Sequence, residues 1–188
     1  MKKFLLLLSL LMLLSLDSFS QSKFNAGAYF NLGFPIGSFS DVAKTGTGGS
    51  LFGEYVVSSP VSITLAVSYQ NFPGDFNKFA VGGKTYDVSV NSIPILAGIR
   101  YYFDEMFFGI LETGAHFYRV SADVSDIYNK EKLSTEFEAK FGAGAGAGLR
   151  YQLAEQSAFE LSGLFNYVTD DLNSIVLRAG VIIYLDKL

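Results

Sequence analysis

The sequence predicts an all-β protein, an eight-stranded antiparallel up-and-down transmembrane β-barrel preceded by a cleavable signal peptide. Three observations support this prediction. Eight segments alternate between apolar residues and polar or small ones, long connections alternate with short ones, and the chain begins with an export signal. An even number of amphipathic strands of about ten residues can close into a barrel that spans a membrane.

The first residues have the three parts of a secretory signal peptide. Two lysines follow the initial Met, residues 4–16 form an apolar run, and Ser18 and Ser20 are small residues that suit a cleavage site. The run is too short to span a bilayer as a helix, which needs about 20 residues. We therefore expect a signal peptide over 1–20 and one mature domain over 21–188.

Composition excludes several functional classes. The formal net charge is −4, which offers no basic surface for nucleic acid. The chain has no Cys, so neither disulfides nor thiol chemistry are expected, and its single His cannot form a multi-His metal site. We expect no cofactor, no metal and no nucleic-acid partner.

The clearest strand covers residues 137–151. Its odd-numbered positions are all apolar, whereas its even-numbered positions are charged residues or glycines. Four glycines in a row on the water-facing side of a strand would weaken it without a compensating interaction. We therefore expect the apolar face to contact lipid and the glycine face to point into a narrow lumen.

The first three strands are predicted over 23–34, 48–57 and 62–70. The first alternates Phe, Ala and Leu with Asn and Gly, and the third alternates Ile, Leu and Val with Ser and Thr. The second is less regular, because Phe52 falls on its polar face. All three remain amphipathic at a period of two.

The fourth and fifth strands, 92–103 and 107–119, are separated by a short turn. Pro94 is the one residue that opposes the prediction, because it cannot donate a backbone hydrogen bond and a closed barrel has no edge strand. We place it at the outer rim, where a long loop enters the strand and a bulge can accommodate it.

The seventh and eighth strands are predicted over 159–167 and 174–185. Aromatic residues at the ends of the strands fit the two aromatic girdles of a membrane barrel. These residues are Tyr55, Tyr69, Tyr101, Phe103, Phe107, Phe117, Tyr151, Phe159 and Tyr167.

Loop length predicts the orientation in the membrane. Every second connection is long, so the long loops gather at one end, outside the cell, with short turns and both termini in the periplasm. The long connections are 35–47, 73–91 and 120–134, with a shorter last loop at 168–173, and the short ones are 58–61, 104–106 and 152–157.

Three segments carry a family resemblance: FNLGFPIGSFS at 30–40, IPILAGIRYYF at 93–103 and LRAGVIIYL at 177–185. The mature chain resembles the small eight-stranded outer-membrane β-barrel family, the OmpA/OmpX-like barrel domain of Gram-negative bacteria. We expect no peptidoglycan-binding domain of the kind found in OmpA, and the final residue given is Leu188 and not Phe.

The resemblance implies a location and partners but no activity. It implies a porin-like barrel in the cell outer membrane. The expected partners are outer-membrane lipid and lipopolysaccharide, and the barrel-assembly machinery during insertion. A partner for the surface loops does not follow from it.

Nine polar side chains fall on the predicted lumen face. In a lumen that excludes water they must pair, and the register places Arg150 opposite Glu160 and Arg100 one diagonal step from Glu112. An eight-stranded barrel is just wide enough for side chains to fill, which favours a structural polar plug over an ion path. The nine are Glu54, Arg100, Glu112, His116, Glu138, Lys140, Arg150, Glu160 and Arg178.

We therefore expect an integral outer-membrane protein with a structural or surface-interaction role through its long loops and without catalytic activity. One alternative is an outer-membrane lipid-modifying enzyme that uses His116, Glu112 and Ser121. The predicted register opposes it, since His116 points inward and Ser121 falls in a loop.

A second alternative is a secreted lipocalin-like ligand-binding barrel, which is also eight-stranded and up-and-down. It requires the opposite polarity, with Ala143, Ala145 and Leu149 lining a cavity.

Overall fold

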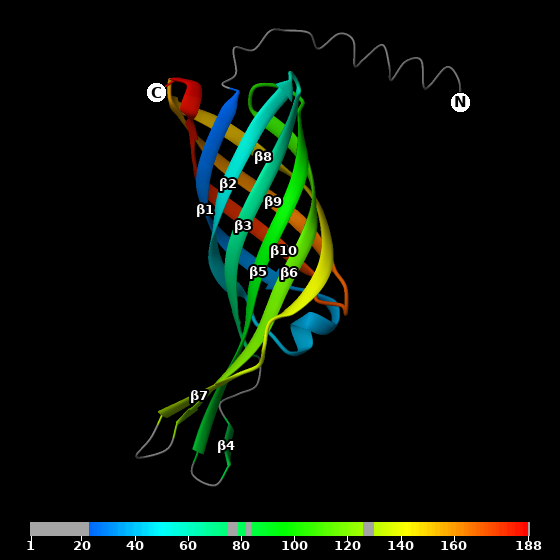
Figure 1. Ribbon diagram of the computed structural model, residues 1–188, viewed down its shortest axis with the longest axis vertical. Helices are drawn as coiled ribbons and strands as arrows, with labels where there is room; N and C mark the ends of the chain where they lie inside the picture. The colour runs from blue at the N-terminus through cyan, green and yellow to red at the C-terminus, as the bar shows by residue number, and fades with distance from the viewer. Residues whose placement is uncertain (1–22, 75–78, 82–83, 126–129, 188) are drawn as a thin grey trace, which may run out of the picture.

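The computed structural model describes residues 23–74, 79–81, 84–125 and 130–187, and it shows a closed antiparallel β-barrel (Figure 1). The predicted signal peptide lies outside the described residues. The wall strands are β1 (Phe24–Pro35), β2 (Gly46–Ser58), β3 (Val61–Pro73), β5 (Lys84–Tyr102), β6 (Phe107–Ser125), β8 (Glu138–Ala154), β9 (Ser157–Val168) and β10 (Ser174–Tyr184).

Shorter elements complete the described chain. They are the strands β4 (Phe79–Val81) and β7 (Lys130–Ser134) and the 3₁₀ turns η1 (Gly37–Asp41) and η2 (Leu185–Lys187). Among the described residues, no helix has the length and apolar character to cross a membrane.

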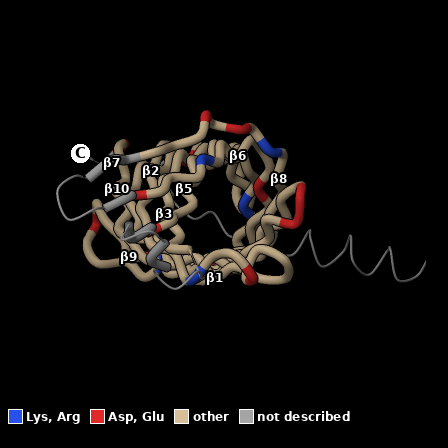
Figure 2. Tube along the Cα trace, turned by 90° about the horizontal axis from the view of Figure 1, so that it is seen from below, with Lys and Arg blue, Asp and Glu red and all other residues tan. Residues whose placement is uncertain are grey.

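Hydrogen bonding closes the barrel. Consecutive wall strands pair antiparallel, and β1 pairs with β10 over the full length from Asn25↔Tyr184 to Pro35↔Ser174. Viewed along the long axis, the strands form a ring (Figure 2). Each wall strand thus has a partner on both sides, which satisfies the backbone groups that lipid could not. The predicted eight-stranded barrel is confirmed.

The two faces of the wall have the predicted polarity. On β8, Phe141 and Tyr151 are 62% and 58% exposed, whereas Gly142 and Arg150 are buried. Ala143 and Ala145 are exposed on the outer face instead of lining a cavity. The lipocalin-like alternative is therefore wrong, because an apolar exterior around a polar interior is the pattern of a barrel in lipid.

The barrel has two distinct ends. The short turns between β2 and β3, β5 and β6, and β8 and β9 lie at the end where β1 begins and β10 finishes, which we call the turn end. The opposite end, which we call the loop end, carries η1, β4 and β7 (Figure 1).

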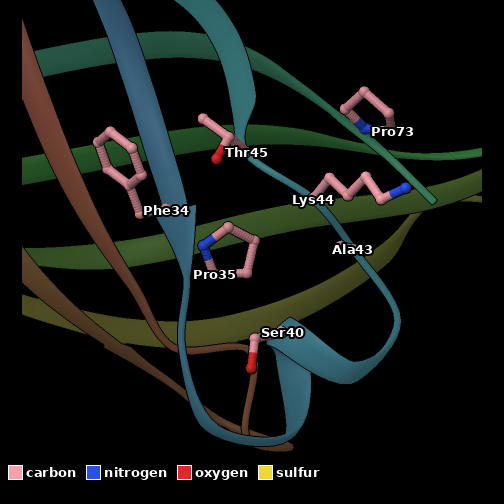
Figure 3. A pocket seen from close by; sticks show the side chains of 7 residues that line it. All are labelled: Phe34, Pro35, Ser40, Ala43, Lys44, Thr45 and Pro73. Atoms are coloured by element: carbon pink, nitrogen blue, oxygen red, sulfur yellow. The ribbon is translucent and has the colours of Figure 1, made fainter. Parts of the chain in front are cut away.

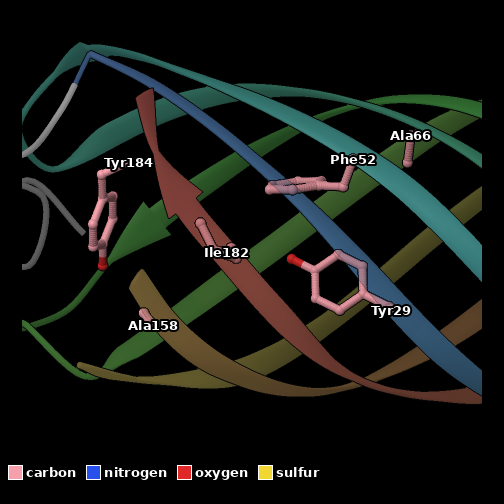
Figure 4. Close-up of a cluster of buried hydrophobic side chains, with 6 residues drawn as sticks. All are labelled: Tyr29, Phe52, Ala66, Ala158, Ile182 and Tyr184. Carbon is pink, nitrogen blue, oxygen red and sulfur yellow. The ribbon is translucent and has the colours of Figure 1, made fainter. Parts of the chain in front are cut away.

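A cluster of buried apolar side chains fills part of the lumen (Figure 4). It includes Phe52, the irregular residue of the second predicted strand, whose ring packs edge-on against Tyr29 at 5.5 Å between centroids. Its members come from five strands and are Tyr29, Phe52, Ala66, Ala158, Ile182 and Tyr184.

A second apolar cluster plugs the loop end. Phe39 on η1 is 1% exposed and packs edge-on against Phe72, with 5.1 Å between ring centroids, and against Tyr118 at 6.3 Å. Val168 and Ala43 complete the cluster. The loop over 35–47 therefore folds back over the barrel and buries its own aromatic residue.

The predicted long loops at 73–91 and 120–134 are wrong in part, because strands continue through them. β5 begins at Lys84 and β6 ends at Ser125, and the two pair up to Thr85↔Ser125. Past the barrel, β5 also pairs with β4, and β6 pairs with β7. We call this extension of β4, β5, β6 and β7 the projecting sheet (Figure 1). Residues 85–90 and 120–125 still alternate between apolar and polar types, so the period-two pattern of the wall continues into this sheet.

The placement of Pro94 at the strand entry is also wrong. Pro94 is buried within β5 and lies opposite His116 in an unbroken register with β6. On its other side the β3–β5 ladder omits two pairs between Val67↔Ile95 and Gln70↔Ser92, without any shift in register. The missing N–H is therefore accommodated by a local gap in one ladder and not by a bulge.

Candidate functional site

The lumen holds a compact set of ion pairs centred on Glu160 of β9, which is fully buried. Arg100 Nη1 donates to both carboxylate oxygens, at 2.8 and 3.0 Å, and Arg150 Nε donates to Oε1 at 2.7 Å. The hydroxyl of Tyr29 donates to Oε2 at 2.5 Å. Two guanidinium groups on one carboxylate leave a positive charge that a second carboxylate must balance.

Glu54 on β2 supplies that second carboxylate. Arg150 Nη2 and Asn25 Nδ2 donate to its Oε2 at 2.7 and 2.8 Å, and the hydroxyl of Tyr102 donates to Oε1 at 2.5 Å. The two arginines and two glutamates form a neutral network that ties β2, β5, β8 and β9 together across the lumen. Buried charges are tolerated when they are paired and hydrogen-bonded in this way.

Aromatic rings border the network. The guanidinium carbon of Arg100 lies 4.1 Å from the ring centroid of Phe52 and 4.5 Å from that of Phe108. These distances are within the range of favourable cation–π contacts. The rings also fill the space beside the charges, so the network is packed as well as paired.

A second ion pair joins β10 to β6. Arg178 donates from Nη1 and Nη2 to the two oxygens of Glu112, both at 2.8 Å, a bidentate geometry. The predicted pairing of Arg100 with Glu112 is therefore wrong, whereas that of Arg150 with Glu160 is observed. Arg100 and Glu112 lie on adjacent strands, but each side chain reaches across the lumen to a strand farther around the barrel.

His116 is buried in the lumen, where its ring stacks on Tyr118 with 6.1 Å between centroids. A Cβ added at Gly142 would lie 2.5 Å from His116 Nε2. Gly144 and Gly148 leave similar space for lumen side chains, those of Asn166 and Phe108. The glycines of β8 thus make room for neighbouring side chains, although these are not the charged ones.

Two of the nine predicted lumen residues lie elsewhere. Glu138 begins β8 at the loop end, and its side chain is 72% exposed. Lys140 is at the rim of the barrel, where its Nζ pairs with Glu138 Oε1 at 2.6 Å and with Asp170. The alternation of β8 directs the Lys140 side chain toward the lumen. At the rim, however, the lumen is open, so this side chain is not fully buried.

Three members of the lumen network escaped the sequence analysis, namely Tyr29, Tyr102 and Asn25. The alternation of their strands already placed them on the inner face. Their hydroxyl and amide groups carry no charge, so a search for ion pairs on that face does not find the donors that complete the carboxylates.

The described residues do not assemble the Ser–His pair of the enzyme alternative. Ser121 is in β6 and not in a loop, and its Oγ accepts a hydrogen bond from Asn91 Nδ2 at 3.2 Å. Five positions separate it from His116 in an uninterrupted ladder, so the two side chains leave opposite faces of the strand. The described part of the chain also contains no group of three or more His, Cys, Asp or Glu that could hold a metal.

A groove of about 600 Å³ lies at the loop end beside η1 (Figure 3). Phe34, Pro35 and Pro73 give it apolar walls, and Lys44 provides a cation. The backbone N–H of Lys44 donates to the carbonyl of Pro73 at 2.7 Å, which fixes the loop against the end of β3.

Comparison with known proteins agrees with this architecture. The family model of the outer membrane protein beta-barrel domain matches residues 5–181. The chain belongs to this family. A search of curated protein sequences found no significant match. Membership of the family indicates that the chain is an outer-membrane protein.

Solved structures with the same fold include several small barrels. Ail of Yersinia pestis, in complex with the heparin analogue sucrose octasulfate, is 13% identical with a TM-score of 0.56, and the match covers 87% of this chain and 98% of Ail. Neisserial surface protein A is 18% identical with a TM-score of 0.53, covering 87% and 97%. OprG from Pseudomonas aeruginosa is 11% identical with a TM-score of 0.53, covering 87% and 95%. Identities this low show a shared fold.

Proposed function

We propose that this outer-membrane barrel is non-catalytic, anchors itself by its lipid-facing wall and acts outside the cell through the projecting sheet. In this arrangement the loop end faces outward, and the turn end and both termini face the periplasm. The lumen network then has a structural role, which is to hold the wall strands together across a filled interior.

The projecting sheet is the observation that carries this proposal. Within the described residues it is the part that extends beyond the barrel, and β4 and β7 each have a strand partner on one side only. An unpaired strand edge presents N–H and C=O groups that can pair with an extended segment of another protein. A partner would thus be bound mainly by backbone hydrogen bonds at these edges.

Removal of the sheet tests the proposal. In the test variant, short Gly-Ser turns replace residues 76–86 and 124–132. We expect this variant to keep the gel-mobility shift between unheated and heated samples that marks a folded barrel. Its cells should lose adherence to one another and to protein-coated surfaces. The matched control inserts Gly-Ser after Glu155 in a short turn at the opposite end.

The outcomes of this experiment separate two roles. Equal adherence of wild-type, truncated and deletion cells would contradict a surface-interaction role. If only the deletion strain becomes sensitive to detergent, the barrel acts as a structural element of the membrane.

Heparin is a defined probe of ligand binding by the projecting sheet, because Ail was solved with a heparin analogue. We expect weak binding of heparin to the sheet, since exposed Asp87 and Asp123 stand opposite each other on it.

The absence of catalysis is tested separately. His116→Ala should leave the lipid profile of the cells unchanged, because the His116 ring is buried between lumen side chains. A changed profile with the barrel still folded would revive the enzyme alternative.

We further propose that the chain is exported with loss of residues 1–20 and reaches the membrane through the barrel-assembly machinery. The intact mass of the membrane-extracted protein tests the cleavage, and accumulation of unfolded protein when the machinery is depleted tests the route. A mature mass that still includes residues 1–20 would contradict the first.

A further inference from the structure

The projecting sheet has an apolar surface that membrane lipid does not cover. On the outer face of the wall, the apolar band ends at a polar row formed by Asn71, Asn91 and Arg119, which pair across β3, β5 and β6. The sheet extends beyond this row (Figure 1). In the proposed orientation, an apolar surface on the sheet is exposed to water unless another molecule covers it.

One face of the sheet is apolar and the other is acidic. The ladder between β5 and β6 runs from the barrel into the sheet without a shift in register, so even-numbered residues stay on the lumen side. Val88 lies opposite Ala122, and Ala122 lies opposite Leu133 of β7, so an apolar row crosses three strands. The exposed Asp87 and Asp123 lie opposite each other on the other face.

The apolar face joins the core of the barrel at its base. Val90 packs against the cluster around Phe39, and Val120, directly opposite Val90, is 43% exposed. Leu133 is 53% exposed. A second apolar surface on this face would extend a hydrophobic core that already exists. We call the five residues of this face the sheet patch, namely Val88, Val90, Val120, Ala122 and Leu133.

We propose that the sheet patch binds the same patch on a second copy of this chain in a facing membrane. The inference rests on the proposed function, which places the sheet outside the cell. Two sheets pack face to face about 10 Å apart with interdigitated side chains. The patch suits itself as a partner, because its five residues carry no charge and the aspartates of each copy stay on the side away from the contact.

The direction of the patch selects a copy in a facing membrane. The patch continues the lumen side of β5 and β6, so it lies above the loop end of its own barrel. Two copies in one membrane that met through this face would place both barrels in the same space. A copy that arrives from outside, with its strands reversed, avoids this overlap. The contact is then two-fold symmetric and brings the same residues of the two copies together.

The size of the patch predicts a weak contact that acts in large numbers. At the usual strand spacing and rise, three strands of about five residues cover on the order of 250 Å² per copy. A stable complex buries roughly 1,200 Å² or more in total, so a single pair would dissociate readily. Two membranes that carry many copies form many pairs at once, which strengthens their attachment.

Vesicle clustering measures the contact. The full chain is folded into phosphatidylcholine vesicles, and light scattering follows their clustering. Leu133→Glu should slow clustering about tenfold relative to wild type, because the contact would bring two carboxylates together in an apolar surface. Ser134→Glu is the matched control, since Ser134 is the exposed next residue on the opposite face of β7, and it should leave the rate unchanged. Pairing through the edge of β7 would affect both variants alike.

Crosslinking at single positions locates the contact. The chain has no Cys, so Ala122→Cys places one thiol in the middle of the apolar row, and Asp123→Cys places one on the other face. Vesicles with differently tagged copies are mixed and treated with a bis-maleimide that spans about 10 Å, the spacing of packed sheets. Dimers that carry both tags should form with Ala122→Cys and not with Asp123→Cys.

Equal clustering by wild type and Leu133→Glu would overturn the inference, as would equal crosslinking at the two positions. Dimers that form only within one vesicle population would overturn the facing arrangement. The gel-mobility shift confirms that each variant is folded. If wild-type vesicles do not cluster but cells still need the sheet for adherence, this inference alone fails. If removal of the sheet leaves adherence unchanged, the proposed function fails as well.

Discussion

Glu160 shows at the scale of a residue why charge in the lumen stabilises the barrel. It has no exposed surface, and it accepts hydrogen bonds from Arg100, Arg150 and Tyr29. Removal of one partner leaves the remaining charged and polar groups buried without their full set of hydrogen bonds. The energetic consequence of a substitution here therefore comes mainly from what is left behind.

Glu160→Gln is expected to lower the free energy of unfolding by about 3 kcal/mol, because two buried guanidinium groups then share the single carboxylate of Glu54. The measurement is the fraction of folded protein on unheated gels across a urea series in lipid vesicles, since the chain has no Trp to report by fluorescence. The control is Glu138→Gln, whose exposed side chain at the rim should leave the midpoint unchanged. Equal midpoints for wild type and Glu160→Gln would contradict a stabilising network.

Gly142→Ala is expected to destabilise the barrel by about 1–3 kcal/mol, because the new methyl group would overlap the His116 ring in a filled lumen. The same urea series applies. Gly53→Ala is the matched control, since its Cβ would meet nothing closer than 4.0 Å on the outer side of β2. If the overlap is the cause, His116→Ala/Gly142→Ala should recover part of the loss, and a strictly additive double variant would argue against it.

At the scale of an element, η1 and the projecting sheet depend on different physical support. η1 has no side-chain cap at its N-terminus and is held by the burial of Phe39 against Phe72 and Tyr118. The projecting sheet is held by backbone pairing along β5 and β6. Substitution of one side chain can therefore release η1, whereas no single substitution can release the projecting sheet.

Phe39→Ala is expected to release η1 without unfolding the wall. Its large ring is almost fully buried, so truncation leaves a cavity and removes the main contact of the segment. Limited proteolysis of intact cells should then cut within 35–47, while the gel-mobility shift persists. Val42→Ala, at an exposed position in the same segment, serves as the control. Equal resistance of both variants to protease would show that other contacts hold η1.

At the scale of the whole molecule, the exposed apolar exterior requires lipid. Leu111 is 64% exposed near the middle of the outer face of β6, between Ile99 and Ala145 of the neighbouring strands. A soluble barrel could not keep such a surface without associating. The closed wall, the polar lumen and the apolar band form one consistent arrangement for a membrane.

Leu111→Arg is expected to cost about 2–4 kcal/mol of folding free energy in vesicles, because it places a charge at the centre of the bilayer. Leu153→Arg, also exposed but at the turn end, should cost about 0–1 kcal/mol, since the charge there reaches water. Urea midpoints in vesicles measure both. Equal costs would mean that the band does not lie at the expected depth.

The sequence alone determined the two-faced strands, their number and the polarity of the wall. These features are local, since alternation at a period of two is written into each segment, as Phe141 and Gly142 show. Arg150 and Glu160 could also be paired correctly, because one short turn fixes their register.

Only the tertiary structure decided which side chains pair across the lumen, how the apolar cluster around Phe39 closes the loop end, and where the projecting sheet forms. Arg100 binds Glu160 and not Glu112, although Glu112 lies on the adjacent strand. Closure of the barrel and the stagger of its strands decide which side chains meet in the lumen. Phe39 and β4 lie in segments without periodicity, where nothing local distinguishes a buried residue or a strand from a loop. Such choices depend on contacts between residues far apart in the chain, and those exist only once the barrel has closed.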